Sequence, residues 1–259
     1  SVHGIARQPF LLSGQIHYAL TVQRHRDKFG KMTTVLYITN EGAEIPLRYS
    51  LRSIAQFMPH DNVVVSGYLP DYVKGVHHVP GKDETGLRDI NIQRKFLAGL
   101  KSEHTHDEVV LMCDDVYLMQ PFTEKRTRYK GLLKDRIASL ETRPENDQFR
   151  LLMEATLRCC EAMGIDEPLD FGCHHPIFMD REKAIEVVEF SLGREVPICV
   201  TTLYQYMNAT QVIKGQQAKG EVWRGSAKGP VYSTSAHIEK NYGFKEYMHL
   251  NLTDTSYEK

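Results

Sequence analysis

Long apolar runs, CxxC cysteine pairs and an excess of charge of either sign are all missing from this 259-residue chain. No apolar run approaches the roughly 20 residues of a membrane helix. The apolar stretch nearest the start is interrupted by polar residues, unlike the core of a signal peptide. The formal net charge of -1 gives no general attraction to nucleic acid or membranes, so any polyanion site must be local. We therefore expect a soluble, cytoplasmic protein.

The five cysteines form no CxxC pair, and their odd number does not suggest a disulfide framework or a zinc site. They fit a reducing compartment. No GxGxxG motif follows the first predicted strand, which argues against a Rossmann dehydrogenase. Hydrophobic and charged residues, at 41% and 25%, are in ordinary proportion for a globular protein. The length suits one large α/β domain.

One stretch, residues 109–122, combines a buried strand with acidic residues. Val109–Met112 is a continuous apolar run of strand length, and it is followed by Asp114 and Asp115. Open α/β sheets bind ligands at the carboxyl ends of such strands. Oxygen ligands of this kind suit Mg²⁺ or Mn²⁺ holding a diphosphate. A solvated turn is the alternative, but the tight apolar flanks favour a metal or catalytic site.

The first half of the chain alternates strands and helices. Strands are predicted at Thr33–Thr39, Asn62–Ser66, Gly75–Val79 and Val109–Met112, and helices from Pro46 to about Phe57 and over Asp89–Lys101. This order predicts an α/β fold with a mostly parallel, Rossmann-like sheet flanked by helices. Residues 1–31 read as a basic N-terminal extension, and residues 32–259 as a single domain.

The second half is less regular. Helices are predicted at Phe149–Met163 and after Asp180, which is a suitable N-cap. Thr201–Asn208 reads as a helix or a strand, Lys214–Gly229 as a mobile loop and Val231–Ser233 as a short strand, and the tail from Phe244 either packs or trails.

Two polar groups of the second half are candidates for function. The first is a basic run directly after the Asp pair, which contains Lys125, Arg126, Arg128 and Lys130. Such runs are usually solvated surface, but its position beside the proposed site makes it a candidate for binding an anionic acceptor. The second is the pair His174 and His175, which precedes Pro176. A histidine is more often structural, yet this pair is a candidate general base or phosphate contact.

Several blocks together resemble a known group of proteins. LRYSLRSI at Leu47–Ile54, VVLMCDDVYL at Val109–Leu118 and CHHPIFMDRE at Cys173–Glu182 resemble the core of the Stealth family of sugar-phosphate transferases. They are still more similar to shorter, often bacteriophage-encoded glycosyltransferase-like proteins, as are GYLPDYV, GIDEPLDF, LYQYMN and STSAH. The similarity runs from about Met32 to the end of the chain. The opening block and the final arginine block of the Stealth family are absent, which favours sugar transfer over phosphotransfer.

The resemblance implies a GT-A fold that binds a nucleotide-sugar, most plausibly UDP-linked, with Mn²⁺ or Mg²⁺. Cys113 stands where a full DxD motif has its first acid, so the implied metal ligands are Asp114, Asp115 and a late histidine, His237. Asp114 would also contact the donor. Arg48 and Arg52 match the arginines of the LRYSLRS block and would contact the donor. Beside the resemblance, further candidates for donor contacts are Thr39, Asn40 and the cations Arg88, Arg94 and Lys95, which could stabilise charge on the departing group. Candidates for the catalytic base are His174, His175 and Asp170, and the choice among them stays open.

The sequence therefore predicts a metal-dependent glycosyltransferase. The expected acceptor is a hydroxymethylated pyrimidine base in phage DNA, which would have to be flipped out or single-stranded. Three alternatives remain: transfer of a sugar 1-phosphate, a glycan or small-molecule acceptor, and an inactive module that only binds nucleotide-sugar or nucleic acid.

Overall fold

The structure is a computed structural model of the chain. It describes residues 32–140, 144–172, 174–208, 211–215, 218–220, 229–234 and 241–258, with the backbone alone at 144–146 and 218–220. The predicted extension, residues 1–31, lies outside these ranges, so its boundary with the main domain stays a prediction. In the part of the chain that is described, no helix has both the length and the apolar character that a membrane span requires.

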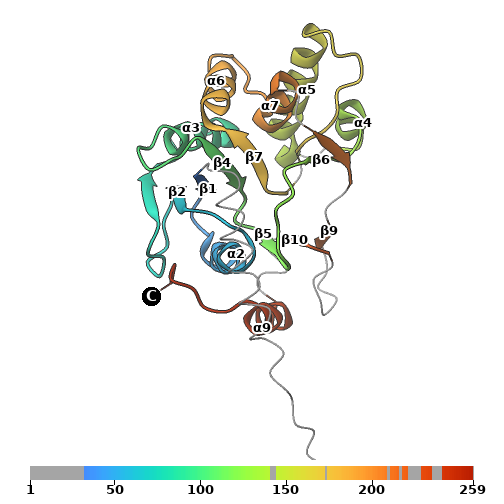
Figure 1. The fold of residues 1–259 in the computed structure, drawn as a ribbon. Coiled ribbons are helices and arrows are strands. Elements are labelled where there is room, and N and C mark those ends of the chain that lie inside the picture. Colours follow the sequence, from blue (N-terminus) through green and yellow to red (C-terminus); the bar gives the residue numbers. More distant parts are fainter. Residues whose placement is uncertain are drawn as a thin grey trace, which may run out of the picture. The chain divides into compact units, whose positions relative to one another are not determined.

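A five-stranded sheet is the framework of the described chain (Figure 1). Its strands follow the order β3-β2-β1-β4-β7, and all neighbours are parallel except β4 and β7. The strands are β1 (Thr33–Thr39), β2 (Asn62–Gly67), β3 (His77–Pro80), β4 (Glu108–Met112) and β7 (Ile177–Asp180). The predicted mostly parallel α/β architecture is confirmed.

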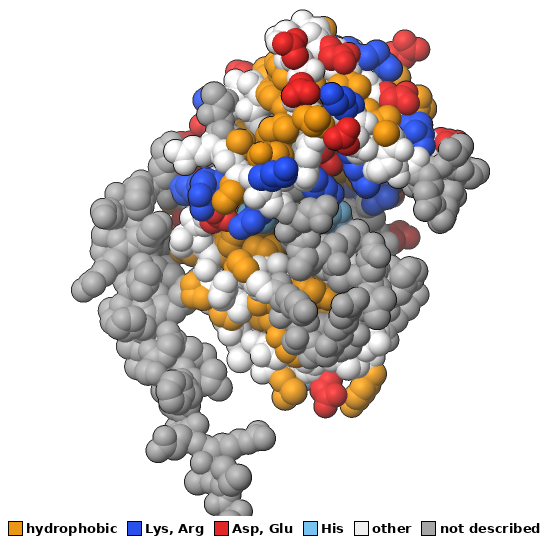
Figure 2. Space-filling view, turned by 90° about the vertical axis from the view of Figure 1, so that its right-hand side faces the viewer, with side chains coloured by type: hydrophobic (Ala, Val, Ile, Leu, Met, Phe, Trp, Pro, Cys, Tyr) orange, Lys and Arg blue, Asp and Glu red, His pale blue; other side chains and the backbone are white. Residues whose placement is uncertain are grey.

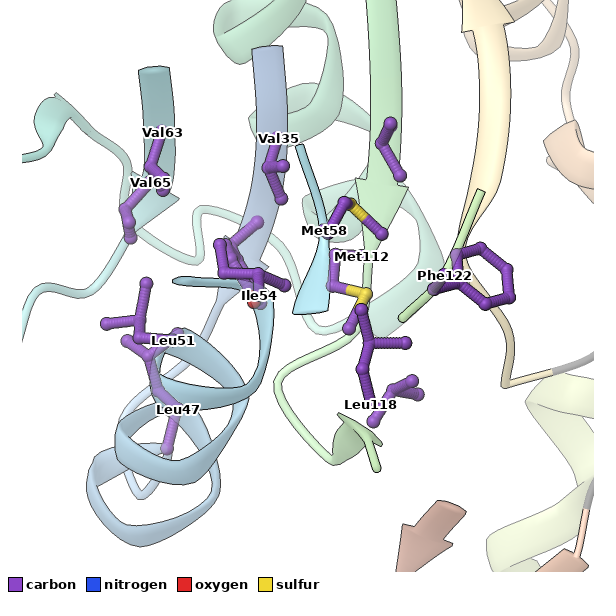
Figure 3. Packing of buried hydrophobic residues seen from close by; sticks show 14 of the residues in the cluster. Val35, Leu47, Leu51, Ile54, Met58, Val63, Val65, Met112, Leu118 and Phe122 are labelled. Carbon is purple, nitrogen blue, oxygen red and sulfur yellow. The ribbon is translucent and has the colours of Figure 1, made fainter. Parts of the chain in front are cut away.

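Helix α2 (Glu44–Phe57) covers one face of this sheet. Pro46 lies in its first turn, where a missing N–H costs nothing. Figure 3 shows Leu51 and Ile54 of the helix packed against strand residues such as Val35 and Val65. All four side chains are buried, so this face contributes a large share of the hydrophobic stabilisation.

Four helices lie on the opposite side. They are α3 (Arg88–Leu100), α5 (Pro144–Ala162), α6 (Arg181–Leu192) and α7 (Val200–Asn208). Side chains that alternate with those facing α2, such as Leu36, Val64 and Val109, pack in this second cluster. Asp180 caps α6 as predicted, because its carboxylate accepts the N–H of Lys183.

Short elements complete the second half. Strand β10 (Val231–Thr234) pairs antiparallel with β5 (Val116–Leu118) and parallel with β9 (Ala218–Gly220). Strand β6 (Thr127–Tyr129) pairs with β8 (Val212–Lys214), and a short helix, α4 (Leu133–Ala138), follows β6 along the chain.

The end of the chain packs as a helix. Helix α9 (Tyr242–Asn251) places Phe244 and Met248 in a third cluster, beside Tyr49 of α2 and Tyr117 of β5. The tail from Phe244, for which the sequence is compatible with packing or trailing, packs against the protein as part of this helix. The predicted loop Lys214–Gly229 is wrong where it includes the end of β8 and all of β9. Its Trp223 and Arg224 lie outside the described residues.

The end of β2 requires a glycine. Gly67 has φ +117°, and a Cβ there would lie 2.2 Å from the carbonyl oxygen of Thr39. We expect Gly67→Ala to lower the free energy of unfolding by about 3 kcal/mol, because the clash is with backbone. Gly42→Ala is the matched control: φ is +95° there, but nothing lies within 4 Å of the new Cβ. It should cost about 1 kcal/mol. Equal losses in urea titrations of the two variants would contradict the steric account.

Candidate active site

The chain turns sharply at the carboxyl end of β4. The N–H of Val116 donates to the carbonyl oxygen of Cys113 at 3.2 Å, which closes a turn around Asp114 and Asp115. The carbonyl oxygen of Asp115 accepts the N–H of Thr234 at 3.2 Å. The acidic pair is thus tied to strand β10 on one side and to the central sheet on the other.

A buried serine on α2, Ser50, holds this turn in place by a hydrogen bond. Ser50 donates its hydroxyl to the carbonyl oxygen of Val116 at 2.7 Å, and that of Cys113 lies 3.4 Å away. The hydroxyls of Ser50 and Tyr37 are 2.9 Å apart. Because Ser50 uses its proton on the turn, Tyr37 must donate to Ser50. Burial raises the pKa of Tyr37, which keeps this phenol protonated for that role.

Asp115 faces His174, which comes from the segment before β7. The Nδ1 atom of His174 lies 3.1 Å from Oδ1 and 3.0 Å from Oδ2 of Asp115. The side chains are partly exposed, at 38% for His174 and 20% for Asp115. Cys113 joins them: one possible metal-binding atom from each of Cys113, Asp115 and His174 lies within 4.8 Å of the others. A thiol, a carboxylate and an imidazole therefore converge at this point.

The neighbouring histidine has a different environment. His175 is buried, its Nδ1 lies 2.8 Å from the carbonyl oxygen of Pro176, and its Nε2 accepts the Nε–H of Arg128 at 3.1 Å. Nδ1 therefore carries the proton. Burial, and more weakly the charge of Arg128, lower the pKa of His175 to about 4. Both ring nitrogens are engaged, so the structure places His174 alone of this pair against Asp115.

Asp170, the third candidate base, braces a turn. Its Oδ1 accepts the N–H of Gly172 at 2.8 Å, and its backbone pairs with Lys130 and Gly131. The side chain is 1% exposed. These contacts support the backbone that leads into the histidine pair.

A second polar group lies at the carboxyl ends of β1 and β2. The ammonium group of Lys95 is 2.6 Å from Oδ1 of Asn40, 3.4 Å from the carbonyl oxygen of Thr39 and 2.6 Å from Oδ1 of Asp83. Lys95 is 4% exposed, whereas Asp83 is 56% exposed. Three of the predicted donor contacts, Thr39, Asn40 and Lys95, are therefore brought together.

The two arginines of the LRYSLRS block bind the end of the chain. Arg52 is buried and forms two hydrogen bonds with the carboxylate of Glu258, at 2.7 and 2.9 Å. Arg48 reaches the same carboxylate at 3.1 Å and lies over the ring of Tyr72. The predicted contact of these arginines with the donor stays a prediction, and their observed partner is the C-terminal segment.

The remaining predicted cations of α3 are at the surface. Arg88 is exposed at the start of the helix, and Arg94 pairs with Glu84 at 2.9 Å. Neither is part of the group around Lys95 as the structure describes it.

The basic run is paired within the protein. Lys125 binds Glu108, Arg126 and Arg128 bind Glu124, and Lys130 donates to the carbonyl oxygen of Gly172. Figure 2 shows Lys and Arg side chains gathered in a band across the middle of one face. Of the run, Lys125 and Arg126 are half exposed, so they are the members that are most available to a partner.

The structure brings together only part of the predicted set of metal ligands. Among the described residues, Cys113 and His174 converge with Asp115, and Asp114 does not belong to this group. His237 lies outside the described residues, so Asp114 and His237 stay predicted ligands. Cys113 occupies an acid's position in DxD, which is the one sequence signal that points to it. The supporting residues Ser50 and Asp83 carried no comparable signal.

No family model matches this chain, and no curated protein matches it. Among solved structures, it is similar to 4-diphosphocytidyl-2C-methyl-D-erythritolsynthase from Anaerococcus prevotii DSM 20548, at 12% identity and a TM-score of 0.40, over 72% of this chain and 88% of that one. It is also similar to the apo form of the glycosyltransferase GlyE from Streptococcus pneumoniae TIGR4, at 6% identity and a TM-score of 0.36. That match covers 84% of this chain and 60% of the other. At such values the function has to be argued from the site, and membership of the Stealth-like group stays a prediction.

Ser50→Ala tests how the acidic turn is supported. The change leaves the Val116 carbonyl and the Tyr37 hydroxyl buried without their partner, so we expect a loss of about 2 kcal/mol in the free energy of unfolding. Ser53→Ala is the matched control. Ser53 is equally buried on the same helix, but its hydroxyl donates only to the carbonyl of Ser50 one turn earlier. If both variants unfold at the same denaturant concentration, Ser50 has no special role in the turn.

Proposed function

We propose that this protein is a metal-dependent glycosyltransferase that moves a sugar from a nucleotide-sugar to a hydroxyl group. The proposal is carried by one observation: the Cys113–Asp115–His174 group follows β4 at the same edge of the sheet where the Lys95 group follows β1. Tyr37 of β1 pairs with Met112 of β4, so the two strands end side by side. Ligands of open α/β sheets bind at this edge.

The two groups suit the two parts of a nucleotide-sugar. Lys95 provides a buried cation, and Asn40 and Thr39 provide polar atoms beside it. We assign this group to the nucleotide part of the donor. Cys113, Asp115 and His174 would hold the metal next to the diphosphate. When bound, the ion would neutralise the negative charge that develops on the departing nucleoside diphosphate. Asp83 lies on an exposed loop, and its negative charge balances the positive charge of Lys95. Asp83 therefore also affects the net charge of the region that would bind the nucleotide.

Fewer residues remain as candidates for the base that receives the proton of the acceptor hydroxyl. His175 has no free lone pair, because Nε2 accepts from Arg128 and Nδ1 carries the proton. We assign it the role of a support: it anchors the segment that carries His174. Asp114, partly exposed on the same turn as Asp115, is the nearest remaining carboxylate in the sequence and is our candidate for receiving the acceptor's proton.

The central test compares two carboxylates at opposite ends of one strand. Asp115 follows β4 and Asp107 precedes it. Purified protein is supplied with a panel of nucleotide-sugars and divalent metals, and the released nucleotide is identified by mass spectrometry. Wild-type protein and Asp107→Asn should release nucleoside diphosphate at equal rates. Asp115→Asn should be slower by roughly 100-fold or more, because it removes charge stabilisation from the transition state.

Other outcomes of that assay identify the alternatives. Release of a nucleoside monophosphate would select sugar-phosphate transfer. No release with any donor, together with nucleotide binding, would select a binding module. An Asp115→Asn variant as fast as wild type would remove Asp115 from the mechanism.

For the acceptor we propose a hydroxymethylated pyrimidine in DNA. The support is the resemblance of the sequence to phage-encoded proteins, together with the exposure of Lys125 and Arg126. Lys125 pairs with Glu108 at the amino end of β4, so DNA bound there would have to extend to the site at the carboxyl end of the strand. Replacing both by Gln should weaken DNA binding and reduce the slope of log K against log salt by about 2. Lys101 and Lys134 are matched controls, because they are exposed to a similar extent and also ion-paired. Equal DNA affinity in the two double variants would contradict the DNA acceptor.

A further inference from the structure

The donor atoms beside Asp115 are not those of a magnesium site. Mg²⁺ is bound in proteins through oxygen atoms and retained waters. Here the three converging side chains supply one sulfur, one nitrogen and one carboxylate oxygen. We propose that this site selects a thiophilic transition metal, of the Zn²⁺ or Co²⁺ type, over Mg²⁺, with Cys113, Asp115 and His174 as its ligands.

The spacing of the three side chains fits such an ion. Sulfur, nitrogen and oxygen bind zinc at about 2.0–2.3 Å, so ligands of one tetrahedral ion lie roughly 3–4 Å apart. The imidazole nitrogen and carboxylate oxygens of His174 and Asp115 are already 3.0–3.1 Å apart, and all three ligand atoms lie within 4.8 Å.

The ligands are also held on supported backbone. Cys113 and Asp115 belong to one turn, which Ser50 supports through its hydrogen bond to the carbonyl oxygen of Val116. His174 is next to the buried His175 and just before β7, whose Ile177 pairs with Leu111 of β4. Both segments are therefore attached to β4, so the site is largely preorganised.

Ligand chemistry then decides which metal is bound. Thiolate and imidazole favour zinc and related ions, whereas Mg²⁺ and Ca²⁺ favour carboxylates, carbonyls and water. On binding, the thiol of Cys113 releases its proton to solvent and a sulfur–metal bond forms, with no change in oxidation state. Three protein ligands leave a fourth position for a substrate oxygen, as in catalytic zinc sites.

The proposed zinc-type site differs from one expectation based on the sequence. The cysteine spacing did not suggest zinc, because no CxxC pair exists. The structure instead combines a single cysteine with two residues of other types. Within the described residues, no other group of three such side chains could hold a metal. Cys160 differs from Cys113 in being fully buried, and burial raises its pKa to about 12.

Cobalt binding tests the proposal directly. The full-length protein is stripped with a chelator and titrated with Co²⁺ while the near-ultraviolet absorption is followed. We expect one equivalent to bind with a thiolate-to-cobalt charge-transfer band. Zn²⁺ should displace it, and excess Mg²⁺ should not. Absence of the band in wild-type protein, or displacement by Mg²⁺, would overturn the proposal.

Three variants locate the sulfur ligand. Cys113→Ser should lose the band and weaken Zn²⁺ binding by roughly 100-fold. Cys199→Ser, the matched control, removes another partly buried cysteine and should keep both. Cys113→Asp should lose the band and shift preference toward Mg²⁺ and Mn²⁺. A band that persists in Cys113→Ser would overturn the assignment.

The inference depends on the proposed metal site but not on sugar transfer. A protein that binds Co²⁺ through Cys113 and releases no nucleotide from any donor would refute the proposed function and leave the metal assignment intact. A protein whose turnover depends on Asp115 but which shows no cobalt–thiolate band would refute the metal assignment and leave the proposed function intact.

Discussion

Strands β1 and β4 lie side by side in the sheet, with a helix layer on each face. Their side chains alternate between the cluster under α2 and the cluster under α3 and α6. A polar group along these strands is buried and needs a partner inside the protein, as the Tyr37 hydroxyl has in Ser50, so groups that remain available to a ligand are confined to the strand ends. The Lys95 group and the acidic turn both follow from this constraint. The candidate site lies at the sheet edge because the rest of each strand has to be apolar.

The same constraint explains how two adjacent histidines differ. One side of the segment before β7 packs against the interior, where Phe122 and Arg128 contact His175. The other side opens toward the acidic turn, where His174 meets Asp115. The chain bends at these two residues, and their side chains meet different surroundings. Burial therefore gives the His175 imidazole a structural role, whereas the His174 imidazole remains available to bind a ligand.

Much of the fold could be read from the sequence, and the site only in part. Strand β1 was predicted with its observed bounds because burial on both faces produces an uninterrupted apolar run. Strands β8 and β9 are three residues each and depend on distant partners, so no local pattern reveals them. Asp115 could be proposed because its position after a strand is a local feature, whereas Lys95 could be proposed only as one of several cations of α3. The partner of Arg52 is 206 residues away, and the sequence does not show whether such an arginine binds a phosphate or a carboxylate.

The central claim is that a nucleotide-sugar and a metal bind together at the carboxyl edge of β1 and β4. A crystal structure with Co²⁺ and a nucleoside diphosphate, with data collected at the cobalt absorption edge, tests it most directly. The account predicts an anomalous peak among Cys113, Asp115 and His174, with the diphosphate beside it and the nucleoside directed toward Lys95. An anomalous peak elsewhere, or a nucleotide bound away from this edge, would contradict the account.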